Sequence, residues 1–422
     1  MPSRKNSYLK TAVTRASKRI TLPIELDEYC KIVNDPKAFR QWLDEMIACY
    51  PELFPAAIEK GYLLHDIRSS RKMPDIRLRR IKLKEADEQG KERVFTIAPS
   101  AVMPYMTGYT DDVEKGLFLR RFGVPFWALS YVFGRNDLYW YRLASHLGRY
   151  EILQTTLRGK GCLPEHLLAD EKHIRFNGQK AYIATTVAED CVLGASISLT
   201  ADTDGLLEAY GHFKQETQRL QADYHPQTVN TDGWSPTQKA WRTLFPLVVI
   251  VECFLHAFLK IRARCKKRSR TSFHQIAHQV WKAYHAPTPE TFQERLQSLQ
   301  EWACQTLTGT TLAAINKLCA KAPLFRLAFD HPQAYRTSNM LDRQMRPMAR
   351  WLENSCFFHG HLSSAERQMR AWALLHNFAP YCPRADVSKE YHSPAHKLNK
   401  SVYHTNWLHN LLISASMAGT DP

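Results

Sequence analysis

The amino-acid sequence predicts a mixed α/β fold, and three observations support this prediction. Between residues 159 and 252, three consecutive strand-like segments are followed by a helix, a short strand, a second helix and a further strand. Hydrophobic residues make up 44% of the 422 residues, which is enough to build sizeable cores. At roughly 150 residues per domain, this length corresponds to about three structural units.

Composition and spacing exclude several classes of protein. The ten cysteines are too sparse and too irregularly spaced for a disulfide-stapled secreted domain. The first residues lack the apolar core of a signal peptide, although their basic, acid-free composition leaves a transit peptide as an alternative. The most apolar stretch, 244–261, contains Glu252, His256 and Lys260, which are costly in lipid. We therefore expect a protein without membrane spans that works in the cytoplasm, associated with the nucleoid if its source is prokaryotic.

Positive charge is concentrated in three runs of a chain whose formal net charge is +16. Residues 1–20 contain six basic residues and no acid, residues 66–84 have a net charge of +6, and residues 258–270 contain seven basic residues and no acid. Local basic surfaces on a near-neutral body indicate a polyanionic partner, with nucleic acid the first candidate. The alternative is that these side chains only keep the surface solvated.

The N-terminal part combines predicted helices with one predicted hairpin. Residues 21–65 are expected to be helical, and 35–50 is the clearest amphipathic stretch. Segments 76–84 and 93–98 flank a polar connection, which predicts a β-hairpin with a basic strand. Residues 111–149 predict three short helices, with breaks at glycines and a helix N-cap at an asparagine.

The third of these helices has two distinct faces. Its apolar face, which we expect to be buried, consists of Leu138, Tyr141, Ala144 and Leu147. Its basic and aromatic face consists of Tyr139, Arg142, His146 and Arg149. A helix-turn-helix that reads double-stranded DNA presents a face of this kind. The alternative is an ordinary helical hairpin with a solvated face.

The central region follows a recognisable order of elements. Its predicted elements are strands at 166–176, 179–190 and 191–202, a helix at 204–220, a strand at 228–232, a helix at 236–245 and a strand at 246–252. The order βββ-α-β-α-β is that of the ribonuclease H fold. Because the last strand is apolar throughout, we expect it to be a central strand covered on both faces. The helical region that follows predicts an insertion into this core.

Three aspartates occupy the positions where such a fold carries its chemistry. Asp170 lies within the apolar first strand, Asp232 follows the fourth strand, and Asp342 lies on a later helix. Each has a simpler explanation: an exposed edge strand for the first, turn chemistry before Gly233 for the second, and a capping arrangement with Asn339 for the third. The buried face of the later helix is expected to consist of Leu341, Met345, Met348 and Leu352.

Several motifs together resemble those of insertion-sequence transposases of the Mutator-like DDE superfamily. TDG at 231–233, the AW and LFP of 240–246, and the CFLH of Cys253–His256 look like the second-acid region of that family, with its C/D-x-x-H motif. ADEKH at 169–173 resembles the first-acid strand. RTSNMLDRQMR at 336–346 resembles the third-acid helix. The sequence departs from the family at this helix.

The departure concerns the third acid. Asp342 stands where the family usually has a glutamate, and a shorter side chain changes how a metal ion would be held. Glu353 and Glu366 are rivals for this role. Glu366 follows Ser363 with the spacing of a capping box, which favours a structural role for it.

The resemblance implies an enzyme that acts on DNA. Asp170, Asp232 and Asp342 would hold two Mg²⁺ or Mn²⁺ ions and cleave double-stranded DNA at the terminal inverted repeats of a mobile element, followed by strand transfer into target DNA. Bringing two ends together implies a homodimer or a larger assembly. Two alternatives stay open: an inactive transposase-derived DNA-binding regulator, and a ribonuclease H-like nuclease without strand transfer.

Two further sets of residues are candidates for binding. The predicted phosphate contacts beside the aspartates are Arg264, Lys266, Lys267, Arg268 and Arg346. For Arg346, the alternative is an ion pair with Asp342 one turn away. Cys253 and His256 lie one turn apart, and Cys356 and His359 repeat this spacing, so a four-ligand zinc site is an alternative to local roles for these side chains.

The predicted organisation has six parts. In chain order they are a basic arm (1–20), a helical and β-hairpin domain (21–108), a helix-turn-helix region (109–158), a ribonuclease H-like core (159–265 and 331–385), a helical insertion (266–330) and a C-terminal tail (386–422).

Overall fold

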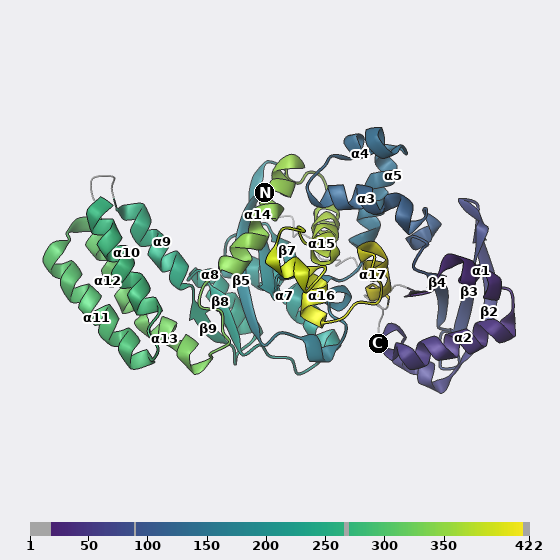
Figure 1. Cartoon of the computed structure of the whole chain (residues 1–422), viewed down its shortest axis with the longest axis horizontal. Helices are drawn as coiled ribbons and strands as arrows, with labels where there is room; N and C mark the ends of the chain where they lie inside the picture. The colour runs from purple at the N-terminus through teal and green to yellow at the C-terminus, as the bar shows by residue number, and fades with distance from the viewer. Residues whose placement is uncertain (1–17, 88–89, 266–269, 417–422) are drawn as a thin grey trace, which may run out of the picture.

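The fold is mixed α/β with two separate sheets, as predicted at the level of fold class. The computed structural model describes residues 18–87, 90–265 and 270–416. Figure 1 shows an elongated molecule with a helical lobe at one end, the five-stranded sheet in the middle and the four-stranded sheet at the other end. No helix of the described residues is long and apolar enough to cross a membrane.

The four-stranded sheet lies in the N-terminal part and has the order β1-β4-β3-β2. Its strands are β1 (Arg19–Leu22), β2 (Tyr62–Ser70), β3 (Met73–Leu83) and β4 (Val94–Pro99). The antiparallel pairing of β3 with β4 confirms the predicted hairpin. Helical structure for all of 21–65 was wrong: the α-helices there are α1 (Leu26–Ile32) and α2 (Pro36–Cys49). β2 was not predicted, because this segment is stabilised as a strand by its pairing with β3, which is a tertiary contact.

Three helices follow, and their existence confirms the prediction for 111–149. They are α3 (Thr110–Arg121), α4 (Phe126–Phe133) and α5 (Asp137–Leu147), with the short α6 (Ile152–Thr156) after them. The Asn136 side chain accepts the backbone N–H of Tyr139 at 2.8 Å, which is the predicted N-cap. Gly134 ends α4 with a φ of 71°.

The buried face of α5 differs from the prediction in its first turns. Leu138 and Tyr141 are 49% and 38% exposed, whereas Trp140 and Leu143 are buried. Trp140 turns inward because it fills the space above Gly116, where a Cβ would lie 2.5 Å from its ring. A helix with aromatic residues on two sides offers two apolar stripes, and packing against α3 decides which one is buried.

The five-stranded sheet has the order β7-β6-β5-β8-β9. Its strands are β5 (His166–Phe176), β6 (Gln179–Ala188), β7 (Cys191–Ser198), β8 (Thr228–Thr231) and β9 (Val249–Glu252), which confirms the predicted strand positions. β5, β6 and β7 are antiparallel neighbours, and β5, β8 and β9 are parallel. β9 lies at the edge of the sheet, so its prediction as a central strand was wrong. It is apolar because Ile250 and Val251 pack into different clusters.

Helices cover both faces of this sheet. α7 (Thr203–Leu220) and α8 (Ser235–Leu244) pack on one face, and α14 (Asn339–Asn354) and α15 (Leu362–Phe378) pack on the other. The predicted apolar face of α14 is buried throughout. The candidate aspartates therefore belong to a three-layer core, in which the sheet lies between two layers of helices.

A helical lobe interrupts this core between β9 and α14. Its helices are α9 (Phe254–Arg264), α10 (Arg270–Tyr284), α11 (Pro289–Thr306), α12 (Gly309–Ala320) and α13 (Ala322–Asp330). They enclose their own apolar cluster, and Figure 1 shows them set apart from the sheet. The predicted helical segments are confirmed, and α13 adds a helix that was not predicted.

The C-terminal segment returns to the N-terminal part of the chain. Its helices are α16 (Pro394–Asn399) and α17 (Trp407–Ser414). The Ser416 hydroxyl bonds to both the backbone N–H and the carbonyl of Thr21, and Ile413 packs into the N-terminal apolar cluster. The residues set apart as a tail thus connect the two ends of the described chain.

Candidate active site

Asp170 lies in the middle of β5, the central strand of its sheet. The edge-strand explanation is wrong, because β6 and β8 flank this strand. The Asp170 side chain is half-buried, and its Oδ1 accepts the backbone N–H of Glu171 at 2.8 Å. Burial and then the charge of Asp232 raise the pKa of Asp170 to about 6. A carboxyl group held in this way marks a candidate functional site.

Asp232, which directly follows β8, lies at the position that corresponds to Asp170 on the neighbouring strand β5. β8 runs parallel to β5 with Leu168 opposite Asn230, so Asp170 and Asp232 follow two residues later on each strand. Asp232 Oδ1 accepts the backbone N–H of Trp234 at 2.8 Å. The turn chemistry proposed as a simpler explanation is therefore present, and it also fixes this carboxylate beside Asp170.

Gly233 is required at its position after Asp232. Its φ is 86°, and a Cβ would lie 2.2 Å from Glu252 Oε1. Glu252 ends β9, is buried, and forms an ion pair with Lys321, which lies between α12 and α13. This ion pair connects the helical lobe to the strand ends beside Asp232, and only glycine leaves room for it.

We expect Gly233→Ala to lower the free energy of unfolding by about 2–4 kcal/mol, because a left-handed backbone and a steric clash act together. The measurement is chemical denaturation. The matched control is Gly178→Ala in the turn between β5 and β6, where φ is 77° but nothing lies within 4 Å of the added Cβ. It should cost about 1–2 kcal/mol from backbone strain alone. Equal losses in both variants would contradict the role of the Glu252 contact.

Asp342 lies in the first turns of α14 and is held by Ser338. The predicted cap is displaced by one residue: Ser338 is the N-cap, and Asn339 is the first helical residue. The Ser338 hydroxyl donates to Asp342 Oδ2 at 3.3 Å and lies 3.2 Å from His256 Nδ1. Its backbone N–H donates to Cys253 Sγ at 3.2 Å. The contacts of Ser338 with Cys253 and His256 thus explain why α14 begins after Ser338 and not after Asn339.

The C-x-x-H motif therefore connects the helical lobe to the third aspartate. Cys253 is the N-cap of α9 and is buried, and His256 lies in the first turn of that helix. The hydrogen bond with Cys253, and after it the charges of Cys253, Asp170 and Asp232, raise the pKa of His256 to about 9 although burial opposes this. The raised pKa of His256 favours the protonated imidazole beside these carboxylates.

These side chains form one compact group. The ligand atoms of Asp170, His256 and Asp342 all lie within 4.8 Å of one another, and in the described part of the chain this is the one such group of three or more potential ligands. Asp232 lies outside this distance, but its charge acts on both Asp170 and His256. Asp170, His256 and Asp342 thus lie together beside the middle of β5, and Asp232, which follows β8, is near enough for its charge to act on them.

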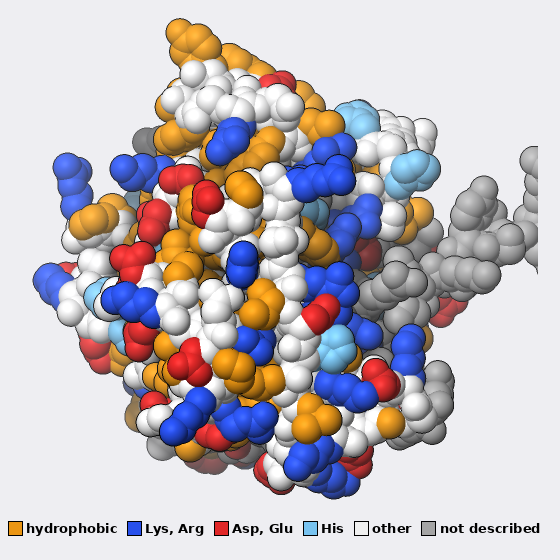
Figure 2. All heavy atoms as spheres, turned by 90° about the vertical axis from the view of Figure 1, so that its right-hand side faces the viewer, with side chains coloured by type: hydrophobic (Ala, Val, Ile, Leu, Met, Phe, Trp, Pro, Cys, Tyr) orange, Lys and Arg blue, Asp and Glu red, His pale blue; other side chains and the backbone are white. Residues whose placement is uncertain are grey.

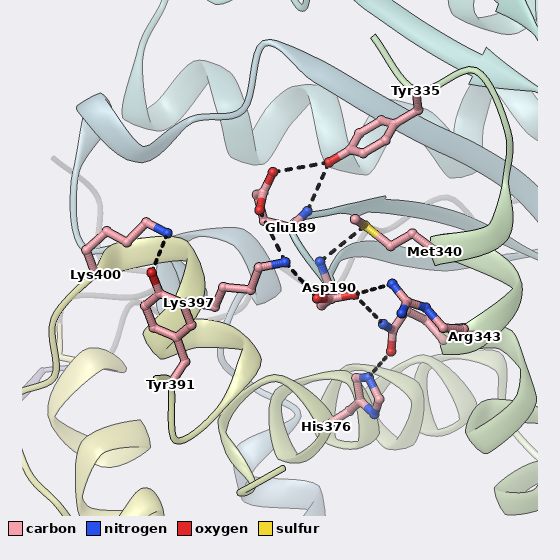
Figure 3. A network of polar contacts seen from close by, with 10 residues as sticks. Glu189, Asp190, Tyr335, Met340, Arg343, His376, Tyr391, Lys397 and Lys400 are labelled. Carbon is pink, nitrogen blue, oxygen red and sulfur yellow. Dashed lines mark hydrogen bonds and ion pairs between the residues drawn. The ribbon is translucent and has the colours of Figure 1, made fainter. Parts of the chain in front are cut away.

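A second anchor holds α14 at the turn between β6 and β7. Figure 3 shows Glu189 and Asp190 in this turn, both with positive φ. Asp190 Oδ1 accepts from Arg343 at 3.2 Å and from Gln344 at 3.4 Å, and Oδ2 accepts from Lys397 of α16 at 2.8 Å. Because Arg343 and Gln344 directly follow the third aspartate, this network fixes the helix that carries it.

A buried carboxyl group lies on the other face of β5. Glu171 Oε1 accepts hydrogen bonds from Tyr210 of α7 at 2.8 Å and from Thr237 of α8 at 2.7 Å. Burial raises the pKa of Glu171 to about 7, although these two hydrogen bonds lower it. α8 directly follows Asp232 in the sequence. Glu171 therefore connects β5, which carries Asp170, to the helix that follows Asp232.

The rival acids and the zinc alternative do not join this group. Glu353 is exposed near the end of α14, and Glu366 Oε1 accepts the backbone N–H of Ile197 at 3.4 Å. Cys356 and His359 are both exposed, and neither belongs to a group of potential ligands in the described chain. The two C-x-x-H pairs therefore do not form one zinc site.

The predicted recognition face of α5 is divided between surface and core. Arg142 and Arg149 are exposed, whereas Tyr139 and His146 are half-buried. His146 lies against the ring of Tyr105 at 4.5 Å, and burial followed by the charges of Arg149, Lys72 and Arg142 lowers its pKa to about 4. Since Lys72 lies at the β2–β3 tip, that tip and α5 share one basic surface.

The other predicted phosphate contacts are only partly described. Arg264 is exposed at the end of α9, and Arg346 is exposed on α14. Within the described residues Arg346 forms no ion pair with Asp342, so that alternative is wrong; the neighbouring Arg343 instead pairs with Asp190. Lys266, Lys267 and Arg268 lie outside the described residues.

Comparisons with known proteins add no family. Neither a scan against protein-family models nor a search of curated proteins found a match to this chain. Any functional assignment must therefore rest on the residues and their geometry.

Sequence reasoning missed several residues that build this site. Ser338, Asp190, Glu171 and the Glu252–Lys321 pair contact the aspartates or the elements that carry them. The one available signal was Glu171, a second acid within an apolar strand, whose alternation with Asp170 places it on the opposite face. The Ser338–Asp342 contact is local, but the contacts of Ser338 with Cys253, of Asp190 with Arg343 and of Glu252 with Lys321 join residues more than 60 positions apart and leave no local pattern.

Proposed function

We propose that this protein is a transposase that binds the ends of a mobile DNA element and catalyses metal-dependent strand cleavage and strand transfer. The observation that carries the proposal is the compact group of Asp170, His256 and Asp342, with Asp232 near enough for its charge to act on Asp170. The ribonuclease H fold has the same strand order as β7-β6-β5-β8-β9, with acids on the first strand, after the fourth and on a later helix. The helical lobe falls where Mutator-like transposases carry an insertion.

The donor set fits divalent magnesium or manganese. Carboxylate oxygens are hard ligands that these ions prefer. A pair of such ions activates an attacking oxygen and stabilises a leaving oxygen in phosphodiester chemistry. The chain itself supplies rigid placement: a central strand holds Asp170, a hydrogen-bonded turn holds Asp232, and Ser338 holds Asp342. His256 lies in the same group as Asp170 and Asp342 and offers a further ligand atom there.

Two surfaces support double-stranded DNA as the substrate. The exposed Arg142 and Arg149 of α5 form a basic surface with Lys72, which lies between β2 and β3. We assign the α3–α5 helices beside it to a helix-turn-helix. Figure 2, which faces the N-terminal end of the molecule, shows many Lys and Arg side chains on this side. Arg264 adds a cation at the end of α9, on the way from the aspartates into the lobe.

The test uses a plasmid that carries the coding sequence with its flanking DNA on both sides. With Mg²⁺ the wild-type protein should cut at the borders of the element, and chelation of the metal should stop the reaction. Asp232→Asn should bind this DNA but cut it at least about a thousandfold more slowly. Asp223→Asn is the matched control, because this aspartate is exposed before β8. Undiminished cutting by Asp232→Asn would contradict the proposal.

A second reaction distinguishes transposase from nuclease. Cut ends should join to a second, unrelated plasmid when both are present with the wild-type protein. Cutting without joining would leave a ribonuclease H-like nuclease as the better description.

A further inference from the structure

Exposed hydrophobic side chains are concentrated on one helical hairpin. Of eleven exposed large hydrophobic side chains among the described residues, eight lie between positions 105 and 141. Five of them belong to the hairpin of α4 and α5: Trp127, Tyr131, Val132, Leu138 and Tyr141. Trp127 is 66% exposed and Tyr131 is 87% exposed. Figure 2 shows hydrophobic side chains at the top of the molecule, the height at which α4 lies in Figure 1.

The same hairpin contains a groove next to these projecting side chains. The groove has a volume of about 490 Å³ and is lined by Pro125, Phe126, Trp127, Asp137, Leu138 and Tyr141. α4 has no charged residue along its whole length, 126–133. An uncharged helix does not neutralise phosphates, so the surface of α4 is unsuited to a nucleic-acid backbone. Its chemistry fits an apolar protein surface.

We propose that the α4–α5 hairpin is the contact surface between two copies of this chain, related by a twofold axis. A twofold interface must be self-complementary, and this hairpin has both parts that such an interface needs. Tyr131 projects from α4, and the groove between α4 and α5 would receive the Tyr131 ring of the other copy. The three exposed rings present roughly 400 Å² if a fully exposed ring offers about 200 Å², and Val132 and Leu138 add to this area. With a polar rim this approaches the ~800 Å² per partner of a stable interface.

Charge on the hairpin favours a second copy over another partner. Arg135 and Asp137 lie on either side of Asn136 in the turn between the helices, and Asp137 lines the groove. Neither forms an ion pair with another residue of the described chain, and Arg135 only lies over the Tyr139 ring at 5.6 Å. Across a twofold axis, Arg135 of one copy would face Asp137 of the other. The pairing would then occur twice, once on each side of the apolar contact.

The proposal does not depend on the enzymatic function. If that function is correct, however, the dimer would place the two exposed Arg142 side chains beside one shared interface, since Arg142 directly follows Tyr141 on α5. Two DNA segments would then be held by one assembly.

The first test measures self-association of the full chain by sedimentation velocity over a range of protein concentrations. The wild-type protein should dimerise, and Tyr131→Glu should weaken the dimer at least about a hundredfold, because two buried anchors are lost per dimer. The matched control is Leu247→Glu, at a 77% exposed leucine before β9. Circular dichroism verifies that each variant is folded. A monomeric wild-type protein, or a dimer that Tyr131→Glu leaves intact, would overturn the proposal.

The second test exchanges the charges. Arg135→Glu alone should weaken the dimer about tenfold, because it opposes Asp137, and so should Asp137→Arg alone. The double variant should restore wild-type association. Failure of restoration would contradict the twofold arrangement. If Tyr131→Glu left self-association unchanged but abolished DNA binding, the hairpin would be a nucleic-acid surface and the proposal would be wrong.

Discussion

Asp170→Asn is expected to abolish metal-dependent DNA cleavage and, at the same time, to stabilise the metal-free protein. Loss of this proposed ligand should slow cleavage by about a thousandfold or more, because divalent ions at such a site would supply several kcal/mol of transition-state stabilisation. The gain in stability follows from the environment of this carboxyl group. Its pKa rises from 3.8 to about 6 on folding, because burial and the neighbouring Asp232 disfavour the charged form.

The pH dependence of this gain has a definite sign. A pKa that is raised on folding means that ionisation costs stability, and that the cost appears as pH rises from about 4 to about 6. Two pKa units correspond to about 3 kcal/mol. Above pH 7, in the presence of a chelator, we expect the free energy of unfolding of Asp170→Asn to exceed that of the wild-type protein by about 1–3 kcal/mol. Below pH 4 the variant and the wild-type protein should be equally stable.

Chemical denaturation at acidic and at neutral pH measures this difference, with Asp223→Asn as the exposed control. Addition of Mn²⁺ should stabilise the wild-type protein at neutral pH and leave Asp170→Asn nearly unaffected. If Asp170→Asn were less stable than the wild-type protein at neutral pH, Asp170 would be a structural residue and the proposed site would lose its first ligand.

Lys321→Met is expected to lower the free energy of unfolding by about 2–4 kcal/mol. Glu252 is 3% exposed, and removal of its partner leaves a buried carboxylate without compensation. Cleavage should also fall, because Gly233 of the second-aspartate turn lies against this ion pair. Denaturation and plasmid cleavage measure the two effects.

Two further variants separate this explanation from a general effect on the helical lobe. Lys317→Met removes an exposed lysine from α12 and should change neither stability nor cleavage. The double variant Lys321→Met with Glu252→Gln removes both charges and should recover at least about half of the lost stability. Equal losses in the single and double variants would show that the ion pair is not what connects the lobe to the sheet.

The central sheet and the three aspartates were predictable from sequence because their signals are local. The segments 166–176 and 179–188 read as strands in isolation, and a carboxylate within an apolar strand such as Asp170 is conspicuous without any knowledge of its neighbours. Asp342 was harder to place, because Glu353 lies on the same helix. Only the position of α14 on the sheet brings Asp342 to Asp170 and leaves Glu353 exposed.

The remaining features depend on contacts that sequence patterns do not encode. Two apolar stripes competed on α5, and Trp140 became buried because Gly116 left space for it, which exposed Leu138 and Tyr141. β9 looked like a central strand because it is apolar, yet helices can cover both faces of an edge strand. The role of Ser338 depends on the contact between α9 and α14, which are separated in the sequence by helices α10–α13.

The most direct test of the central claim is a Mn²⁺ titration of the full chain, with free Mn²⁺ followed by electron paramagnetic resonance. The wild-type protein should bind about two ions. Asp170→Asn, Asp232→Asn and Asp342→Asn should each lose at least one of them, whereas Glu353→Gln, on the same helix as Asp342, should bind like the wild-type protein. Unchanged binding in all three aspartate variants, or loss of binding in Glu353→Gln but not in Asp342→Asn, would contradict the proposed site.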